Sequence, residues 1–250
     1  MNLMPANPRG DALSVACQDC SLFQLALPVG RDEPDWALLD RVVKRRRLLE
    51  RGEPLFQPGD PFLFLYAVKF GSLKTYVSLP DGHDQITGFH LPGELLGLDA
   101  IDGEVHPCGA RALEPTGLCE VPLNRLEELG ELVSGVQRQM LRIMSRQLLH
   151  DQRLQTVLCR QNADERLAAF LLSLSDRLRG RGFDGDRFRL SMTRADIGNY
   201  LGVAKETVSR LFTRFERAGL LAIEHRQLRL LDRQGLAALA GVPAGTTPFR

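Results

Sequence analysis

The sequence contains no hydrophobic run long enough to cross a membrane. Its apolar stretches all fall well short of the roughly 18 residues that a transmembrane helix requires. The opening segment MNLMPANPRGDALSV lacks the apolar core of a signal peptide, so we do not expect secretion. Both absences argue against a membrane protein.

Cysteine is also scarce. The chain has 5 cysteines in 250 residues, an odd number without the pattern of a disulfide framework. Thiols of this kind are kept reduced in the cytoplasm, which is the localisation that we predict.

An excess of charge of one sign is missing as well, since the formal net charge is +1. Overall composition therefore gives no sign of a nucleic-acid partner, but the distribution of charge does. The segment 160–233 carries 15 Lys/Arg and 10 Asp/Glu, so the rest of the chain is acidic. This asymmetry suits a DNA-binding C-terminal part that is joined to a more acidic part.

The most informative segment is 192–221, which has the pattern of a helix, a tight turn and a second helix. Thr193 is an expected N-cap, with Asp196 at the N3 position as a weaker relative of the capping box. Gly202 can supply a left-handed turn, and Gly219 can end the second helix after Ala218. Two such helices joined by a glycine turn favour DNA binding.

The second of these helices has two stripes at helical spacing. Its apolar stripe is expected to face the core and consists of Val208, Leu211, Phe212 and Phe215. Its polar stripe offers groups that a major groove can bind and consists of Glu206, Ser209, Arg210 and Thr213. The alternative is an ordinary surface helix with an ion pair between Glu206 and Arg210.

The segment 48–120 has short hydrophobic runs separated by glycine and proline turns, which indicates a β sandwich or barrel. The expected strands are Leu63–Val68, Leu73–Leu79, Gln85–His90 and Gly117–Val121. Before them, Asp35–Arg47 is expected to be a helix with a basic C-terminus.

Helical periodicity then extends from Pro122 to about Cys159, followed by a helix at Ala163–Arg179. The first of these helices has an a/d seam that favours pairing with a second copy, although packing on its own β domain is an alternative. The seam consists of Leu141, Met144, Leu148, Asp151, Gln155 and Leu158. Across a two-fold axis Asp151 would face its own copy and repel it, unless it points outward.

Two strands, Leu220–Ile223 and Gln227–Leu231, flank His225-Arg226 and predict a wing behind the second helix. The tail after Gly241 is rich in Pro, Gly and Thr and is expected to fray.

Near the N-terminus, Cys17 and Cys20 form a C-x-x-C motif, which is typical of a metal, cluster or redox site. Two incidental thiols are the alternative. Because no βαβ pattern or base accompanies the pair, we do not predict a thiol oxidoreductase or any other enzyme.

In this order, a β domain, a long helix and a winged helix-turn-helix resemble the CRP/FNR family of bacterial transcription regulators. Within that family the chain looks most similar to the oxygen-sensing FNR/Anr branch. The segments that carry the resemblance are Gln85–Pro92, Asn162–Arg166, Ile197–Gly202 and Glu206–Arg210. The resemblance implies an α+β fold with an N-terminal antiparallel β-roll of the cyclic-nucleotide-binding type. The domains that we expect are an arm at 1–34, the β-roll sensor at 35–121, a dimerisation helix at 122–159, the winged helix-turn-helix at 160–241 and a tail at 242–250.

The Glu-x-x-Ser-Arg signature of this branch implies a homodimer that binds inverted repeats of half-sites like TTGAT. By this resemblance Arg210 would contact the guanine, Glu206 the cytosine and Ser209 a neighbouring base. Candidate phosphate contacts are Thr193, Arg194, Lys205 and Arg214. The turn Pro80–Asp84 lies where relatives contact RNA polymerase, which favours an activator.

The resemblance also implies a [4Fe–4S] cluster held by four cysteines. Cys17, Cys20 and Cys119 match three of them, but the spacing of the remaining one falls on Ala26, which cannot be a ligand. Four possibilities therefore stay open. The cluster has a non-cysteine fourth ligand, it takes a three-iron form, Cys108 contributes to it, or the cluster is lost. Otherwise Cys108 and Cys159 are expected to be structural.

A cyclic nucleotide is the competing ligand on this fold. Relatives that bind one hold its phosphate with an Arg-Ser or Arg-Thr pair, whereas this chain has His106-Pro107-Cys108-Gly109 after Gly93–Gly97. We therefore expect no cAMP binding. A cyclic-nucleotide-responsive or cluster-free regulator of the CRP type is the alternative function.

Overall fold

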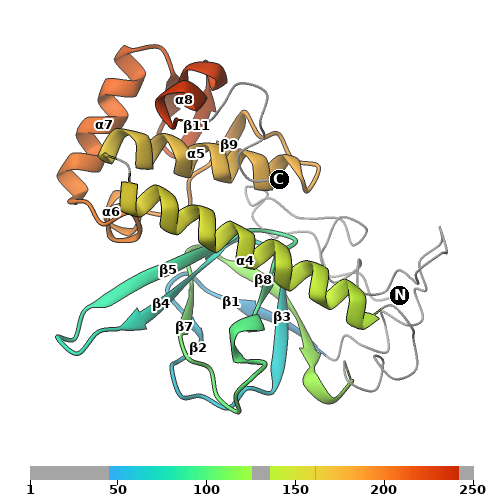
Figure 1. Ribbon diagram of the computed structural model, residues 1–250. Coiled ribbons are helices and arrows are strands. Elements are labelled where there is room, and N and C mark those ends of the chain that lie inside the picture. The colour runs from blue at the N-terminus through green and yellow to red at the C-terminus, as the bar shows by residue number, and fades with distance from the viewer. Residues whose placement is uncertain (1–44, 126–135, 161, 242–250) are drawn as a thin grey trace. The chain divides into compact units, whose positions relative to one another are not determined.

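The structure of the protein is a computed structural model that describes residues 45–125, 136–160 and 162–241 (Figure 1). Contacts between Cα atoms divide the chain into two units, with the boundary between Arg146 and Gln147. None of the described helices is long and apolar enough to cross a membrane.

The described residues of the first unit contain eight short strands, with a 3-10 turn at Leu98–Ala100. The strands are β1 (Arg45–Leu49), β2 (Pro54–Phe56), β3 (Phe64–Phe70), β4 (Leu73–Ser78), β5 (Asp84–His90), β6 (Leu95–Leu96), β7 (Gly109–Ala112) and β8 (Thr116–Pro122). The four strands predicted in this region are confirmed.

The strands form two antiparallel sheets, with the orders β1-β8-β3-β6 and β2-β7-β4-β5. Buried side chains from both sheets meet in one cluster, among them Val68 and Leu118 from the first sheet and Leu73 and Ala110 from the second. The core therefore lies between the sheets, as expected for a β-roll.

The prediction of a helix that ends in a basic cluster is wrong for Arg45–Arg47. These residues belong to β1 and pair with Leu118–Glu120 of β8, with Arg46 opposite Cys119. Strand β8 pairs with β1 on one side and with β3 on the other. This pairing decides that the segment is a strand. The local sequence pattern does not predict it, because the two paired strands lie far apart in the chain. Residues 35–44 lie outside the described part of the chain.

Helix α4 (Val136–Arg160) crosses the boundary between the two units and confirms the long helix predicted from periodicity. The second unit continues with α5 (Ala163–Arg179), α6 (Arg194–Leu201), α7 (Lys205–Arg217) and α8 (Arg233–Leu239). The observed bounds of α5 are those predicted. Its N-cap Asn162 accepts from the Glu165 amide at 3.1 Å, and the Glu165 carboxylate accepts from the Asn162 amide at 3.2 Å.

A three-stranded antiparallel sheet completes the second unit, in the order β10-β11-β9 (Figure 1). Strands β10 (Leu221–Glu224) and β11 (Gln227–Leu230) are the predicted wing, and His225 turns between them with a φ of 57°. The sequence does not predict strand β9 (Arg187–Arg189), because three residues are too few to show a period.

Candidate nucleic-acid interface

Helix α6 begins at a complete capping box. The Asp196 amide donates to the Thr193 hydroxyl at 3.1 Å, and the Thr193 amide donates to the Asp196 carboxylate at 2.9 Å. The Thr193 hydroxyl also donates to the same carboxylate at 2.6 Å. The predicted N-cap is therefore confirmed, and the cap uses the hydroxyl proton of Thr193.

The turn between α6 and α7 depends on two glycines. Gly202 ends α6 with a φ of 66°, the left-handed conformation predicted for it. Gly198 accepts a hydrogen bond from the Val203 amide at 2.9 Å, and a Cβ atom at this position would lie only 2.6 Å from the Val203 carbonyl oxygen. The absence of a side chain at Gly198 thus allows the chain to fold back tightly behind α6.

Helix α7 separates its two stripes as predicted. The apolar stripe of Val208, Leu211, Phe212 and Phe215 is buried, and the polar stripe of Glu206, Ser209, Arg210 and Thr213 is exposed. The alternative ion pair between Glu206 and Arg210 does not form. Arg210 donates to the Thr207 hydroxyl at 3.3 Å, and Glu206 lies 3.7 Å from the ammonium group of Lys205.

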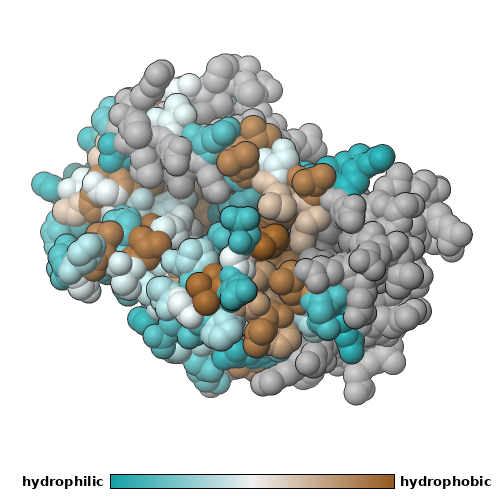
Figure 2. Space-filling view, turned by 60° about the horizontal axis from the view of Figure 1, so that its bottom comes forward, coloured by the Kyte–Doolittle hydropathy of each residue, from teal (hydrophilic) through white to brown (hydrophobic). Residues whose placement is uncertain are grey.

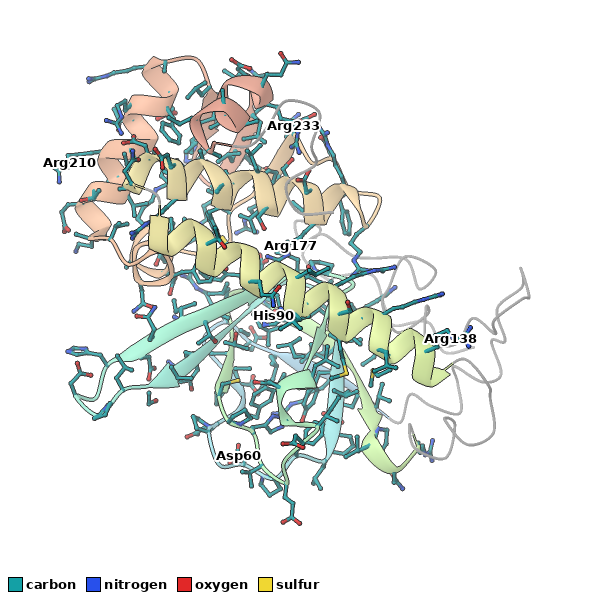
Figure 3. The ribbon with its side chains drawn as sticks, in the orientation of Figure 1. Asp60, His90, Arg138, Arg177, Arg210 and Arg233 are labelled. Carbon is teal, nitrogen blue, oxygen red and sulfur yellow. The ribbon has the colours of Figure 1, made fainter. Side chains whose placement is uncertain are left out.

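Two hydroxyls of the polar stripe of α7 are hydrogen-bonded within the helix. The Ser209 hydroxyl donates to the Lys205 carbonyl at 3.0 Å, and the Thr213 hydroxyl donates to the Ser209 carbonyl at 3.3 Å. Figure 3 shows Arg210 pointing outward from the helix. Since the bonds of these hydroxyls are local, their oxygens face solvent and can accept or exchange hydrogen bonds with an incoming partner.

Two of the four candidate phosphate contacts, Arg194 and Arg214, contact side chains of other helices. The Arg194 guanidinium lies 3.4 Å from the centroid of the Phe212 ring, and burial lowers its pKa from the usual value. Arg214 forms an ion pair with Asp164 in the first turn of α5. Lys205, at the start of α7, is exposed to solvent.

The first turn of α5 holds both helices of the helix-turn-helix. Besides the ion pair of Asp164 with α7, the Arg166 guanidinium donates to the Leu201 carbonyl oxygen at 3.0 Å, at the C-terminus of α6. Phe170 of α5 also lies against Tyr200 of α6, with 5.6 Å between the ring centroids. Asp164 thus holds α7 directly, and Arg166 and Phe170 hold α6, to which α7 is joined by the turn.

Helix α4 presents the first part of the predicted seam to solvent. Leu141, Met144 and Leu148 are 67%, 36% and 59% exposed, and Leu149 beside them is also exposed. Figure 2 shows hydrophobic residues reaching the surface among hydrophilic ones on the face that it presents. Asp151 and Leu158 lie in α4, but their side chains are outside the described part of the structure.

Of the candidate cluster ligands, Cys17, Cys20 and the position of Ala26 lie outside the described residues. Cys119 is half-buried on β8, where it pairs in register with Ala67 of β3. Its neighbour Leu118 faces the core between the sheets, so Cys119 lies on the opposite face of its sheet. Within the described residues, no three His, Cys, Asp or Glu side chains are grouped to hold a metal ion.

Cys108 occupies a different environment. It lies in the core between the two sheets, and its thiol donates to the Asp99 carboxylate at 3.1 Å. Burial, together with Asp99, raises the pKa of this thiol above its usual range. The core position agrees with a structural role and argues against a joint site with Cys119, which faces the other way.

Nearby, His106 is 1% exposed and stacks on Phe56, with ring centroids 3.7 Å apart and planes inclined by 6°. Burial lowers the pKa of this imidazole. His106 lies in the segment that the resemblance to nucleotide-binding relatives assigns to the phosphate. A buried neutral ring among aromatic side chains is not suited to an anion.

A helix-turn-helix with an exposed polar stripe, followed by a wing and preceded by a β-roll, defines a DNA-binding regulator with a separate sensor-type domain. Comparison with known proteins supports this classification. Residues 165–239 match the Crp-like helix-turn-helix domain, and residues 46–131 match the cyclic nucleotide-binding domain.

Several curated proteins are similar along nearly the whole chain. "Transcriptional activator protein FnrA" of Stutzerimonas stutzeri is 51% identical over 225 residues, which are 90% of this chain and 92% of that protein. "Fumarate and nitrate reduction regulatory protein" of Escherichia coli is 43% identical over 228 residues, 91% of each chain. Among solved structures, that of FixK2 from Bradyrhizobium japonicum covers 82% of this chain and 100% of its own, with a TM-score of 0.73 and 32% identity. The chain belongs to the CRP/FNR family of transcription regulators, as predicted, and is not an enzyme.

Proposed function

We propose that the protein is a homodimeric transcription activator that binds inverted repeats of TTGAT-like half-sites and responds to oxygen or redox state in the cytoplasm. The observation that carries the DNA-binding part is the exposed polar stripe of α7, on a helix that α5 holds in a fixed orientation. The similarity to proteins named transcriptional activators supports activation rather than repression.

We assign direct recognition of bases to three residues of α7. The guanidinium of Arg210 can donate two parallel hydrogen bonds to the O6 and N7 atoms of guanine, and the Glu206 carboxylate can accept from the cytosine amino group. Ser209 lies between them on the exposed face and suits a neighbouring base. Thr213, one turn further along α7, supplies an adaptable hydroxyl. Sequencing the DNA that the protein selects from a random library tests this assignment, because it must return a guanine at a fixed position of each half-site.

Contacts to the DNA backbone would come from residues beside that stripe. Lys205 is exposed at the start of α7 and can place its ammonium group on a phosphate. Thr193, Arg194 and Arg214 stay in the proposal, although each already has a partner within the protein. A phosphate would then share Arg214 with Asp164, which keeps the guanidinium oriented before DNA arrives.

Dimerisation is assigned to α4. Leu141, Met144 and Leu148 are spaced by three and four residues and exposed, which suits packing against a second copy, and Asp151 and Leu158 continue the same spacing. Such a dimer would present two α7 helices about 34 Å apart, one turn of DNA. Leu148→Glu should shift the protein toward monomer in sedimentation experiments, whereas the exposed Leu231→Glu should not.

For the sensor, Cys17, Cys20 and Cys119 are the residues that would hold an iron–sulfur cluster, which supplies oxygen-sensitive redox chemistry when bound. Cys119 would thereby tie the N-terminal arm to the outer face of β8, shortly before the chain enters α4. Anaerobic purification with an absorption spectrum and an iron and sulfide count tests this assignment, together with an Ala26→Cys variant. Protein without iron or sulfide, whose DNA binding is independent of oxygen, would contradict it.

RNA polymerase is the further partner that we propose. The turn Pro80–Asp84 between β4 and β5 is exposed throughout, and within it the Asp81 carboxylate accepts from the His83 amide at 3.0 Å. Asp81→Ala should reduce transcription from a target promoter without weakening DNA binding. An equal loss of both would instead point to a folding defect.

A further inference from the structure

We propose that Thr207 is a positioning residue for base recognition. Its hydroxyl holds Arg210 away from Glu206, and so keeps both charged side chains available for a G·C base pair. Thr207 is half-buried on α7, where the helical spacing places it between the polar stripe and the apolar stripe. The inference rests on the proposed function, since it assigns a role to a residue beside those that read the bases.

An ion pair between Glu206 and Arg210 would compete with DNA. The two residues are four positions apart with the glutamate nearer the N-terminus, which is the favourable arrangement for such a pair on a helix. The pair would occupy the carboxylate that accepts from cytosine and the guanidinium that donates to guanine. DNA would then have to break it before either base could be bound. The structure keeps the two groups apart instead.

Thr207 holds the arginine. The Nη2 atom of Arg210 donates to the Thr207 Oγ1 atom at 3.3 Å, across one turn of the helix. Because threonine is branched at Cβ and this side chain is half-buried, its oxygen is restricted to few positions. A guanidinium has five N–H donors, so one bond to Thr207 leaves two parallel donors for the O6 and N7 atoms of guanine. The bond therefore orients Arg210 without preventing recognition.

Glu206 is attracted in the other direction. Its carboxylate lies 3.7 Å from the ammonium group of Lys205. Helix α7 also begins after Ala204, whose side chain forms no capping hydrogen bond, so the partial positive charge of the first turn favours a carboxylate there. Both effects hold Glu206 toward the N-terminus of α7 and away from Arg210.

The other two hydroxyls of α7 do not act on Arg210. Ser209 and Thr213 donate to backbone carbonyls of their own helix, at 3.0 and 3.3 Å. The Thr207 hydroxyl is the one that accepts from the arginine side chain. A substitution at Thr207 should therefore change the behaviour of Arg210.

The test measures the contact of Arg210 with guanine without changing the opposite base. In one duplex the guanine of each half-site is replaced by 7-deazaguanine, which lacks the N7 acceptor but still pairs with cytosine. The ratio of the affinities for the guanine and 7-deazaguanine duplexes, the N7 ratio, is measured for the wild type, Thr207→Val, Thr207→Ser and the double variant Thr207→Val with Glu206→Gln. Thr87→Val, at an exposed threonine of β5, is the matched control.

For the wild type and Thr87→Val, we expect an N7 ratio of about 2- to 10-fold per half-site. Thr207→Val keeps the shape of the side chain but removes the acceptor, so Arg210 can pair with Glu206 and the ratio should be lost. Thr207→Ser keeps the hydroxyl and should keep the ratio. In the double variant residue 206 has no charge to attract Arg210, so the ratio should return. The affinity of Thr207→Val for scrambled DNA and its melting temperature should equal those of the wild type.

Three results would overturn the inference. The first is a Thr207→Val variant that keeps the wild-type N7 ratio. The second is an equal loss of affinity for the inverted repeat and for scrambled DNA, which would show that Thr207 contacts a phosphate. The third is a ratio that Glu206→Gln does not restore. A wild-type protein with no N7 ratio above 1 would instead contradict the contact of Arg210 with guanine in the proposed function, which is a separate outcome.

Discussion

The guanidinium of Arg166 donates a 3.0 Å hydrogen bond to the carbonyl oxygen of Leu201, so the start of α5 closes the C-terminus of α6. The carbonyl groups of the last helical turn have no partner within their own helix. Arg166 satisfies one of them at the turn that aims α7, and its positive charge suits a helix C-terminus.

Replacing this side chain should destabilise the second unit. Arg166→Met keeps most of the aliphatic stem but removes the charged donor, and we expect a loss of about 1 to 2 kcal/mol in the free energy of unfolding. Urea unfolding followed by far-UV circular dichroism measures it, and DNA affinity should fall in parallel. Arg166→Lys should recover part of both losses. If the urea midpoint of Arg166→Met equals that of the wild type, the hydrogen bond from Arg166 to Leu201 does not stabilise the turn.

Gly198→Ala should break the turn of the helix-turn-helix. The new Cβ would lie 2.6 Å from the Val203 carbonyl, which is backbone and cannot rotate away. We expect a cost of about 1 to 3 kcal/mol, which outweighs the gain of roughly 1 kcal/mol in helix propensity. Gly180→Ala is the matched control, because a Cβ there would meet its nearest atom at an ordinary 3.4 Å. The contrary result is a Gly198→Ala variant as stable as Gly180→Ala.

The stability of the β-roll should depend on pH through His106. Burial lowers the pKa of His106 in the folded protein below the unfolded value of about 6.5, despite the nearby carboxylates of Asp99 and Asp60. The unfolded chain therefore binds more protons below pH 6.5, and stability falls as pH falls through this range, by at most about 1.4 kcal/mol per pH unit. His106→Phe should flatten that slope between pH 5 and 7 in urea titrations, while the exposed His83→Gln should keep it. Equal slopes in all three proteins would exclude His106 as the titrating group.

The thiols of Cys108 and Cys119 should differ in reactivity. The Cys108 thiol is buried, donates to Asp99 and has a raised pKa, so little thiolate forms, whereas Cys119 is half-buried on an outer face. Brief treatment of the reduced, native protein with iodoacetamide should modify Cys119 at least about tenfold faster than Cys108. Peptide mass spectrometry resolves the two sites, and treatment in urea should remove the difference. Equal rates in the native protein would contradict the placement of Cys108 in the core.

Local pattern was sufficient for much of the second unit. The Thr193 cap, the left-handed Gly202 and the two stripes of α7 all follow from residues within about two helical turns of each other, and each is confirmed. Amphipathic helices with clear caps are the elements that a sequence specifies most directly.

Long-range contacts account for what the sequence did not predict. Arg214 was expected only as a phosphate contact, but its partner Asp164 lies in another helix, 50 positions earlier in the chain. The stacking of Arg194 on Phe212 likewise depends on how α6 and α7 pack. The strand conformation of Arg45–Arg47 comes from its pairing with β8. No spacing rule in the sequence reports such contacts.

The most direct test of base recognition by α7 is discrimination at the guanine of the half-site. Binding to the inverted repeat is compared with binding to a repeat in which that guanine is replaced by adenine, for the wild type, Arg210→Ala and the control Arg217→Ala at the end of α7. Because a bidentate contact contributes about 1 to 3 kcal/mol of discrimination, the wild type and Arg217→Ala should prefer guanine by roughly 5- to 150-fold, and Arg210→Ala should bind both repeats equally. An Arg210→Ala variant that retains the wild-type preference would contradict the assignment of α7 as the recognition helix.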